Sequence, residues 1–246
     1  MRIIVIGESC KDIFVYGNVK RLSPEAPVPV FNPIESISNL GMSGNVVQNL
    51  KSLDSDLNII HWSQTENITK TRYVDRKSNH MFLRVDDGED IIKPLELNVS
   101  KLNAIRNVDA VIVSDYNKGF LTDEMLLEIT KNSKFSIIDT KKQIGDILVE
   151  GFDFVKLNES EFNKHNFNES LLNKILVTLG SNGAKYEGKI YPSPDPKETI
   201  DVSGAGDTFT ASFTLKYLKT NNVEESIIFA NKMASIVVSK RGVATP

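Results

Sequence analysis

Residues 201–208 read Asp-Val-Ser-Gly-Ala-Gly-Asp-Thr and lead directly into an amphipathic helix pattern over residues 208–218. The three small residues at 204–206 have almost no side-chain bulk, so an anion can approach their N–H groups while the helix dipole favours its negative charge. Asp207 would stand beside this anion hole, where a carboxylate can accept a proton from an attacking hydroxyl. This combination indicates phosphoryl transfer. The alternative is an ordinary helix start, in which the glycines serve the backbone and Asp207 complements the dipole.

Outward from this stretch, short apolar runs alternate with helical patterns. Runs of strand length lie at residues 3–6, 57–62, 110–113, 135–138, 152–157 and 175–179. Helical patterns lie at residues 45–53, 95–105, 122–130, 208–218 and 223–239. This alternation predicts an α/β fold with a mostly parallel sheet covered on both faces. Asp139 ends one of these runs, where an open parallel sheet has its ligand crevice, although it could equally be a turn residue.

Two stretches interrupt this alternation, at about residues 13–31 and 71–86. The first contains Pro24, Pro27 and Pro29, which cannot donate to a central ladder and so suit an edge or a projecting flap. The second is short, alternating and charged. We predict one domain over residues 1–246, in which these two segments form a small β lid. Because lid edges rich in Val and Pro need cover, we also predict a homodimer in which the lids of two subunits pack together.

Composition excludes several classes of function. The 246 residues carry a formal net charge of -3, so no general field attracts nucleic acid or anionic membranes, and neither is expected as a partner. A single cysteine, no signal segment and no apolar run of ~20 residues predict a cytoplasmic protein. The three histidines lack ligand-like spacing, so a zinc site has little support. Neither a P-loop nor the protein-kinase motifs are present, so phosphate transfer would need another scaffold.

Residues 204–207 resemble the signature of the ribokinase-like (PfkB-type) carbohydrate kinases, in which the Asp is the catalytic base. Further segments resemble the motifs of this family in family order: Gly-Glu-Ser-Cys-Lys-Asp at 7–12, Gly-Met-Ser-Gly-Asn at 41–45, Asn-Glu-Ser-Glu at 158–161 and Thr-Leu-Gly-Ser-Asn-Gly at 178–183. The heptose 7-phosphate kinases are the most similar members, on Arg-Leu-Ser-Pro-Glu-Ala-Pro-Val-Pro-Val at 21–30, Ser-Asp-Tyr-Asn-Lys-Gly at 114–119 and Asp-Thr-Lys at 139–141. The resemblance implies a ribokinase-like three-layer sandwich with a mostly parallel central sheet and a small β lid.

The resemblance also implies a role for each motif residue. The catalytic residues would be Gly204, Ala205, Gly206, Asp207 and Asp139. Sugar hydroxyls would be held by Asp12, Gly41, Asn45 and Asp115, and a phosphate on the substrate by the cationic Lys118 and Arg84. ATP would lie near Asn158, Thr178, Gly180, Gly183 and Asn231. Mg²⁺ would be organised by Glu161 and Asp139, partly through water. Candidates for a K⁺ loop are Asp201 and Ser203.

Several of these residues also have simpler explanations. In the simpler explanation, Asp12 serves merely to cap a turn and Asn45 merely to start a helix. Lys118 and Arg84 could be solvated surface charges, as isolated basic residues usually are. Asn231 by itself reads as a polar residue in a buried helix. The roles above therefore rest on the order of the motifs along the chain.

The reaction implied is ATP-dependent phosphorylation of the anomeric hydroxyl of a sugar phosphate, with D-glycero-D-manno-heptose 7-phosphate as the expected acceptor and Asp207 as the base. Two alternatives remain open: a kinase for another sugar or sugar phosphate, and a catalytically silent protein that binds sugar or nucleotide. An intact base beside an anion hole weighs against the silent protein. A panel of acceptors would separate a heptose 7-phosphate kinase from a kinase for another sugar or sugar phosphate.

Four features depart from the family pattern. Met42 replaces the second glycine of the sugar-binding pair, and Glu8 replaces an aspartate in the first strand. A helix-plus-strand segment is missing between Trp62 and Lys70, so one wall of the usual site is expected to be absent or supplied by another subunit. No fused nucleotidyltransferase domain is expected after Pro246.

Overall fold

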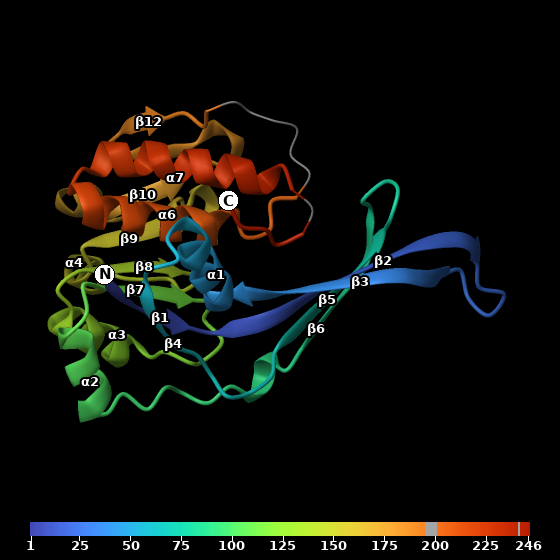
Figure 1. Cartoon of the computed structure of the whole chain (residues 1–246), viewed down its shortest axis with the longest axis horizontal. Helices are drawn as coiled ribbons and strands as arrows, with labels where there is room; N and C mark the ends of the chain where they lie inside the picture. The colour runs from blue at the N-terminus through green and yellow to red at the C-terminus, as the bar shows by residue number, and fades with distance from the viewer. Residues whose placement is uncertain (195–200, 241) are drawn as a thin grey trace.

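The computed structural model describes residues 1–194, 201–240 and 242–246. Within these residues, a central sheet has the strand order β12-β11-β10-β9-β8-β7-β1-β4 (Figure 1). Its strands are β1 (Arg2–Gly7), β4 (Asn58–Trp62), β7 (Ala110–Asp115), β8 (Ser136–Thr140), β9 (Phe154–Asn158), β10 (Ile175–Thr178), β11 (Ala184–Tyr186) and β12 (Lys189–Tyr191). Along this order, the six neighbouring strands β4, β1, β7, β8, β9 and β10 pair in parallel. At the other edge, β11 and β12 pair antiparallel. The predicted mostly parallel sheet is confirmed.

Helices cover both faces of this sheet and complete three layers (Figure 1). One face carries α1 (Ser43–Leu53), α6 (Ala205–Thr220) and α7 (Val223–Val238), packed on a core that includes Leu50, Phe154 and Phe213. The other carries α2 (Val99–Arg106), α3 (Asp123–Asn132) and α4 (Asp146–Gly151), packed on Leu126 and Phe152. Short turns complete the set: α5 (Glu159–Phe162), η1 (Glu89–Ile91), η2 (Glu169–Lys174) and η3 (Gly180–Asn182). Within the described part of the chain, no helix is long and apolar enough to cross a membrane.

Helix starts are where the structure corrects the sequence pattern. The helix expected from residue 95 begins at Val99, because the Asn98 side chain caps it by accepting from the Lys101 N–H. Leu95 is buried in the preceding loop, where its N–H donates to the Phe120 carbonyl. The apolar pattern therefore included a loop residue that is buried without being helical, which made the predicted helix too long at its start. The short α4 and the β11–β12 hairpin were not predicted, because they are too brief to show a period.

The predicted lid is a second sheet that projects from the sandwich (Figure 1). It contains β2 (Ser9–Leu22), β3 (Pro29–Met42), β5 (Thr69–Asp75) and β6 (Met81–Asp87), in the order β3-β2-β5-β6. Pro29 and Pro33 lie on the edge strand β3, as expected of residues without an N–H. The lid extends beyond the predicted segments, back to Ser9 and on to Met42.

The chain crosses between sandwich and lid four times, at Glu8, after Met42, through residues 63–68 and at Gly88. Neighbouring crossings are bonded to one another: the Ser43 N–H donates to the Glu8 carbonyl (2.9 Å). Gln64 exchanges two hydrogen bonds with the Ser9 backbone, at 2.9 and 2.6 Å. This short link stands where the family resemblance leads one to expect a helix and a strand, and it leaves β4 at the edge of the sheet.

Candidate active site

A cavity of about 490 Å³ opens between the carboxyl ends of β8, β9 and β10 and helices α6 and α7. It brings together most of the residues predicted for catalysis and nucleotide binding: Asp139, Asn158, Thr178, Gly180, Gly183, Gly204, Ala205, Gly206, Asp207 and Asn231. Tyr116, Lys141 and Lys156 also line it. The residues predicted for the sugar, on the lid, in α1 and at the end of β7 and the loop after it, lie outside this lining. The cavity therefore corresponds to the nucleotide side of the predicted site.

The start of α6 has the geometry that its sequence predicts. Gly204 precedes the helix in the left-handed conformation, with φ 81°. A Cβ on Gly204 would lie 2.5 Å from Asn45 Nδ2, so no larger residue fits there without moving Asn45. The Ala205 N–H donates to the Val202 carbonyl (3.3 Å). The other N–H groups of the first helical turn have no partner within the helix, which leaves them available to an anion in the cavity.

Asp207 is a buried carboxylate with two donors in place. Asn45 Nδ2 donates to one oxygen (2.9 Å) and the Tyr116 hydroxyl donates to the other (3.1 Å). Burial and then the charge of Asp139 raise the pKa of Asp207 to about 7, against the lowering effects of Asn45, Lys156 and Tyr116. A carboxylate with this pKa can accept a proton near neutral pH.

Asn45 is held in its orientation by residues that the sequence did not single out. Asn49 Nδ2 donates to Asn45 Oδ1 (3.0 Å), and the Thr208 hydroxyl donates to Asn49 Oδ1 (2.8 Å). The amide of Asn45 must therefore present its nitrogen to Asp207. The contact of Asn45 in this structure is with the base, which adds a positioning role to the predicted sugar contact.

Glu8 anchors the loop that carries Tyr116. Its fully buried carboxylate accepts the N–H groups of Tyr116 (2.9 Å), Lys118 (2.8 Å) and Phe120 (3.4 Å). Asp115, predicted to hold a sugar hydroxyl, is also buried and accepts from the Thr140 hydroxyl and the Asn117 N–H. Burial and the nearby Glu8 raise the pKa of Asp115. Both carboxylates thus shape the loop in this structure.

On the lid side, the predicted sugar residues are paired with neighbours. Asp12 forms a buried ion pair with Arg72, and a Cβ on Gly41 would clash with Asp12 Oδ2, which requires glycine at that position. Met42 has φ 57° and ψ -135°, a backbone conformation that favours glycine, and its side chain is buried against Cys10. The departure from the second family glycine therefore places a strained, bulky residue beside the predicted acceptor site.

The cations predicted for the substrate phosphate belong to one network of ion pairs on the lid side. Lys118 pairs with Glu89 (2.5 Å), and Arg84 pairs with Asp86 (2.7 Å). Lys70, which the sequence did not single out, is buried and joins these two pairs, because its Nζ lies 2.8 Å from Glu89 and 3.9 Å from Asp86. A phosphate bound here would have to replace these carboxylates as partner.

The predicted nucleotide residues lie at two tight turns, one at the start of α5 and one at η3, and on α7. Asn158 and Glu161 form a capping box at the start of α5, with bonds of 2.8 and 2.7 Å, and Lys141 pairs with Glu161 (2.5 Å). Gly183 has φ 91°, and a Cβ there would clash with the Tyr191 carbonyl. Asn231 Nδ2 donates to that same carbonyl (2.8 Å). Both turns carry their polar groups to the wall of the cavity or to its margin.

Comparisons with known proteins show the family of the chain. The family model described as "pfkB family carbohydrate kinase" matches residues 42–246. A relative described as "Bifunctional protein HldE" from Helicobacter pylori is 31% identical over 99% of this chain and 64% of its own length. Another of the same description, from a Nitratiruptor species, is 31% identical over 99% of this chain and 63% of its own length. The chain thus spans somewhat less than two thirds of these relatives.

Solved structures share the fold at lower identity. Ribokinase from Thermotoga maritima is similar with a TM-score of 0.72 and 19% identity, covering 98% of this chain and 94% of that one. Arabidopsis thaliana ribokinase, in a complex with ribose and ATP, is similar with a TM-score of 0.66 and 18% identity, covering 98% and 93%. The ribokinase-like fold is confirmed. With the family model matching most of its length, the chain belongs to the pfkB family of carbohydrate kinases.

Proposed function

We propose that this kinase transfers the γ-phosphoryl group of ATP to the anomeric hydroxyl of a sugar phosphate, D-glycero-D-manno-heptose 7-phosphate. The observation that carries the proposal is Asp207, a buried carboxylate in the first turn of α6 whose pKa is raised to about 7 and which lines the cavity. The choice of acceptor is supported by the 31% identity to the HldE relatives and by the resemblance of residues 21–30 and 114–119 to heptose 7-phosphate kinases.

In the proposed reaction Asp207 accepts the proton of the acceptor hydroxyl as its oxygen attacks the γ-phosphorus. The bond from phosphorus to the β,γ-bridging oxygen breaks, and ADP leaves. Charge that develops on the transferred group is stabilised by the N–H groups of residues 204–206, which are already oriented by the helix. Asn45 and Tyr116 keep the base in place throughout.

The carboxylates of the cavity fit a Mg²⁺ ion bound together with nucleotide phosphates. Asp139 Oδ1 is buried without a hydrogen-bond partner among the described residues. No group of three His, Cys, Asp or Glu side chains that could hold a metal by itself occurs in that same part of the chain. Mg²⁺ is commonly held by one or two carboxylates plus phosphates and water. Asp139 and Glu161 would hold such an ion, which would neutralise phosphate charge when bound. A K⁺ ion at Asp201 and Ser203 stays a prediction.

A second candidate is a kinase for a different sugar, and Met42 is the observation that favours it. A buried methionine in a backbone conformation suited to glycine reduces the space beside the acceptor site. Because sugar specificity depends on close contacts of this kind, a change of acceptor would follow from it.

Measurement of ADP release tests the acceptor. With Mg-ATP we expect heptose 7-phosphate to give a kcat/KM at least about 10²-fold above that of unphosphorylated heptose and ribose, which lack the phosphate contact, and also above that of fructose 6-phosphate, whose sugar differs in size and hydroxyl positions. Turnover that is highest with one of the other sugars would move the assignment to that acceptor. Absence of turnover with every sugar, despite ATP binding, would favour the silent binding protein.

We also propose a homodimer through the outer face of the lid. Ile13 and Val15 of β2 lie opposite Thr71 and Tyr73 of β5, which in turn lie opposite Val85 and Leu83 of β6. Directly opposed residues share a face, so this side of the lid is mostly apolar. Leu83 is 56% exposed and Val85 is 44% exposed. A second copy of the same face is the occupant that the symmetry of most oligomers favours.

Light scattering at micromolar concentration is expected to give twice the mass of the chain. The double variant Leu83→Lys/Val85→Lys should be monomeric and folded, because charges on this face oppose its burial. Ile228→Lys is the matched control, since Ile228 is equally exposed (55%) but lies on α7. A monomeric wild type would contradict the dimer.

A further inference from the structure

A buried lysine lies at the centre of the cavity wall. Lys156 of β9 stands directly opposite Asp139 of β8 in the sheet register, so the two side chains project from the same face. Lys156 is 3% exposed, and its Nζ lies 2.8 Å from Asp139 Oδ2. Lysine is rarely buried, and a buried pair of charges is a poor source of stability compared with apolar packing. The position therefore requires a functional explanation.

The ammonium group of Lys156 lies beside the anion hole. Its Nζ is 2.8 Å from the place where a Cβ on Gly206 would stand, and Lys156 lines the cavity with Gly206 and Asp207. An ammonium has three N–H donors, and among the described residues Asp139 is its one hydrogen-bond partner. Lys156 therefore brings a positive charge and further donor capacity to the first turn of α6, where a phosphoryl group would arrive.

We propose that Lys156 is a catalytic residue whose ammonium group binds the phosphoryl group as it passes from ATP to the acceptor. The inference rests on the proposed kinase reaction. The acceptor oxygen forms a bond to the γ-phosphorus, the bond to the β,γ-bridging oxygen breaks, the hydroxyl proton goes to Asp207, and ADP leaves. Lys156 keeps its proton and gains electrostatic contact as charge grows on the transferred oxygens.

Asp139 acts on Lys156 as a positioning residue in this arrangement. Its Oδ2 holds the ammonium close to Gly206, and its Oδ1 has no hydrogen-bond partner among the described residues. Without Asp139, a flexible lysine side chain would have several orientations within the cavity. With the pair in place, the charge is already oriented before the nucleotide binds, which is the condition for strong electrostatic catalysis.

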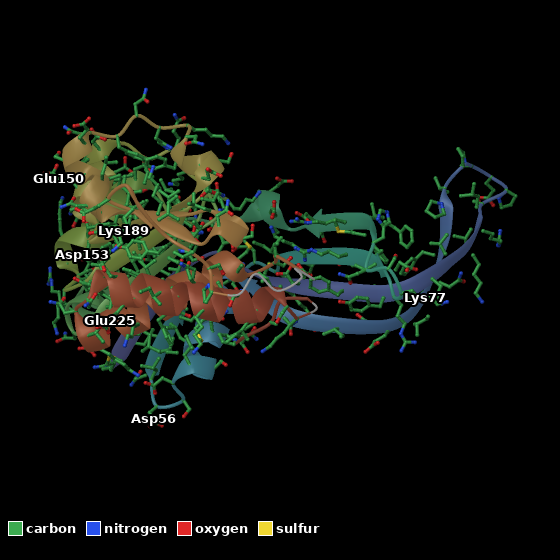
Figure 2. All side chains as sticks on the ribbon, turned by 90° about the horizontal axis from the view of Figure 1, so that it is seen from above. Asp56, Lys77, Glu150, Asp153, Lys189 and Glu225 are labelled. Carbon is green, nitrogen blue, oxygen red and sulfur yellow. The ribbon has the colours of Figure 1, made fainter. Side chains whose placement is uncertain are left out.

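Replacement by methionine keeps the length of the side chain and removes the charge. We expect Lys156→Met to lower kcat by about 10² to 10³, the usual cost of one preorganised donor. By calorimetry, its affinity for the non-hydrolysable analogue AMP-PNP should fall at least about tenfold more than its affinity for ADP, because only AMP-PNP carries a γ-phosphate. Lys189→Met is the matched control. Lys189 pairs with Glu224 (2.8 Å) on the outer surface of the sandwich (Figure 2), and its loss should change neither quantity.

Two further measurements keep the test decisive. If Lys156→Met does not fold, the double variant Lys156→Met/Asp139→Asn removes both buried charges, and its AMP-PNP and ADP affinities are compared with those of Asp139→Asn alone. A folded variant that loses both affinities by the same factor, or keeps a wild-type kcat, overturns the assignment to Lys156.

The proposed function fails in a different way. Wild-type protein that transfers phosphate while Lys156→Met is unaffected overturns only the role of Lys156. If no sugar is phosphorylated but the selective loss of AMP-PNP affinity is seen, Lys156 stands as a γ-phosphate ligand and the acceptor assignment is overturned. Wild-type protein that binds neither nucleotide overturns the proposed function.

Discussion

Asp207→Asn is expected to lower kcat by about 10² to 10⁴ while changing the affinity for ATP by no more than about threefold. The substitution removes the base and keeps the shape of the side chain. An amide oxygen can still accept from Asn45, and its NH₂ group can donate to the Tyr116 hydroxyl, which also accepts. Initial rates and calorimetry on the same preparation measure the two quantities. A variant that retains wild-type kcat would show that the proton goes elsewhere.

The pH dependence of the wild type follows from the same carboxylate. Because the base must be deprotonated and its pKa is raised to about 7, kcat/KM should rise with pH through about 7 and then level off. The charged and titratable groups that affect this pKa are Asp139, Lys156 and Tyr116. A profile that is flat from about pH 5.5 to about pH 8.5 would exclude Asp207 as the base.

Stability should change in the opposite direction from activity. A carboxyl group whose pKa is raised in the folded state binds its proton more tightly there. Asp207 therefore lowers the free energy of unfolding least at pH values below 3.8, the ordinary pKa of an aspartate. As pH rises towards 7, the buried charge reduces the free energy of unfolding by roughly 2–4 kcal/mol. Asp207→Asn should therefore raise Tm, and the gain over wild type should be larger at about pH 8 than at about pH 5. An equal change at both pH values would argue against a buried charge.

Glu8→Ala is expected to lower the free energy of unfolding by about 3–5 kcal/mol and also to lower kcat. Three backbone N–H groups, those of Tyr116, Lys118 and Phe120, would lose their acceptor in a fully buried place, at about 1–3 kcal/mol for each unsatisfied group before relaxation. The loop would then no longer hold the Tyr116 hydroxyl on Asp207. Urea unfolding and initial rates measure the two effects.

Two conservative variants serve as controls for Glu8. Glu8→Gln keeps one oxygen as acceptor, so the loss of stability should be smaller than with alanine. Glu8→Asp restores the usual family residue but shortens the side chain by one methylene, so it should not reach all three N–H groups. If alanine costs less than about 1 kcal/mol, Glu8 is not the anchor of this loop.

The helix start at residues 204–207 was predictable from sequence because its parts are adjacent in the chain. Residues 204–207 form one helix start, and local rules describe helix starts well. The spacing of Asn158 and Glu161 is also local, and the structure shows its physical basis as a capping box. Strands and layers followed from long apolar runs. These features need no knowledge of which distant segments meet.

Contacts between distant segments could not be predicted in the same way. Lys156 lies in a run that was read as a buried strand, and only its charge within that apolar run could have drawn attention to it. Its pairing with Asp139 depends on the register of β8 and β9. Likewise, Lys118 and Arg84 were expected to bind phosphate, but their partners Glu89 and Asp86 became visible only once the lid was placed. The contacts of Asp115 depend on β8 in the same manner.

The four crossings under the lid are each held against a neighbouring one, by hydrogen bonds or by close packing, and this restricts how the lid can move. Ser43 is tied to Glu8, Ser9 to Gln64, and Gly88 lies so close to the Asn67 carbonyl that a Cβ would clash with it. Segments held side by side in a row resist independent sliding and twisting, so rotation about the row is the motion that these contacts oppose least. The lid would swing about that row. Each closure would then bring Asp12, on the moving part, to the same place relative to Asn45, on the fixed part.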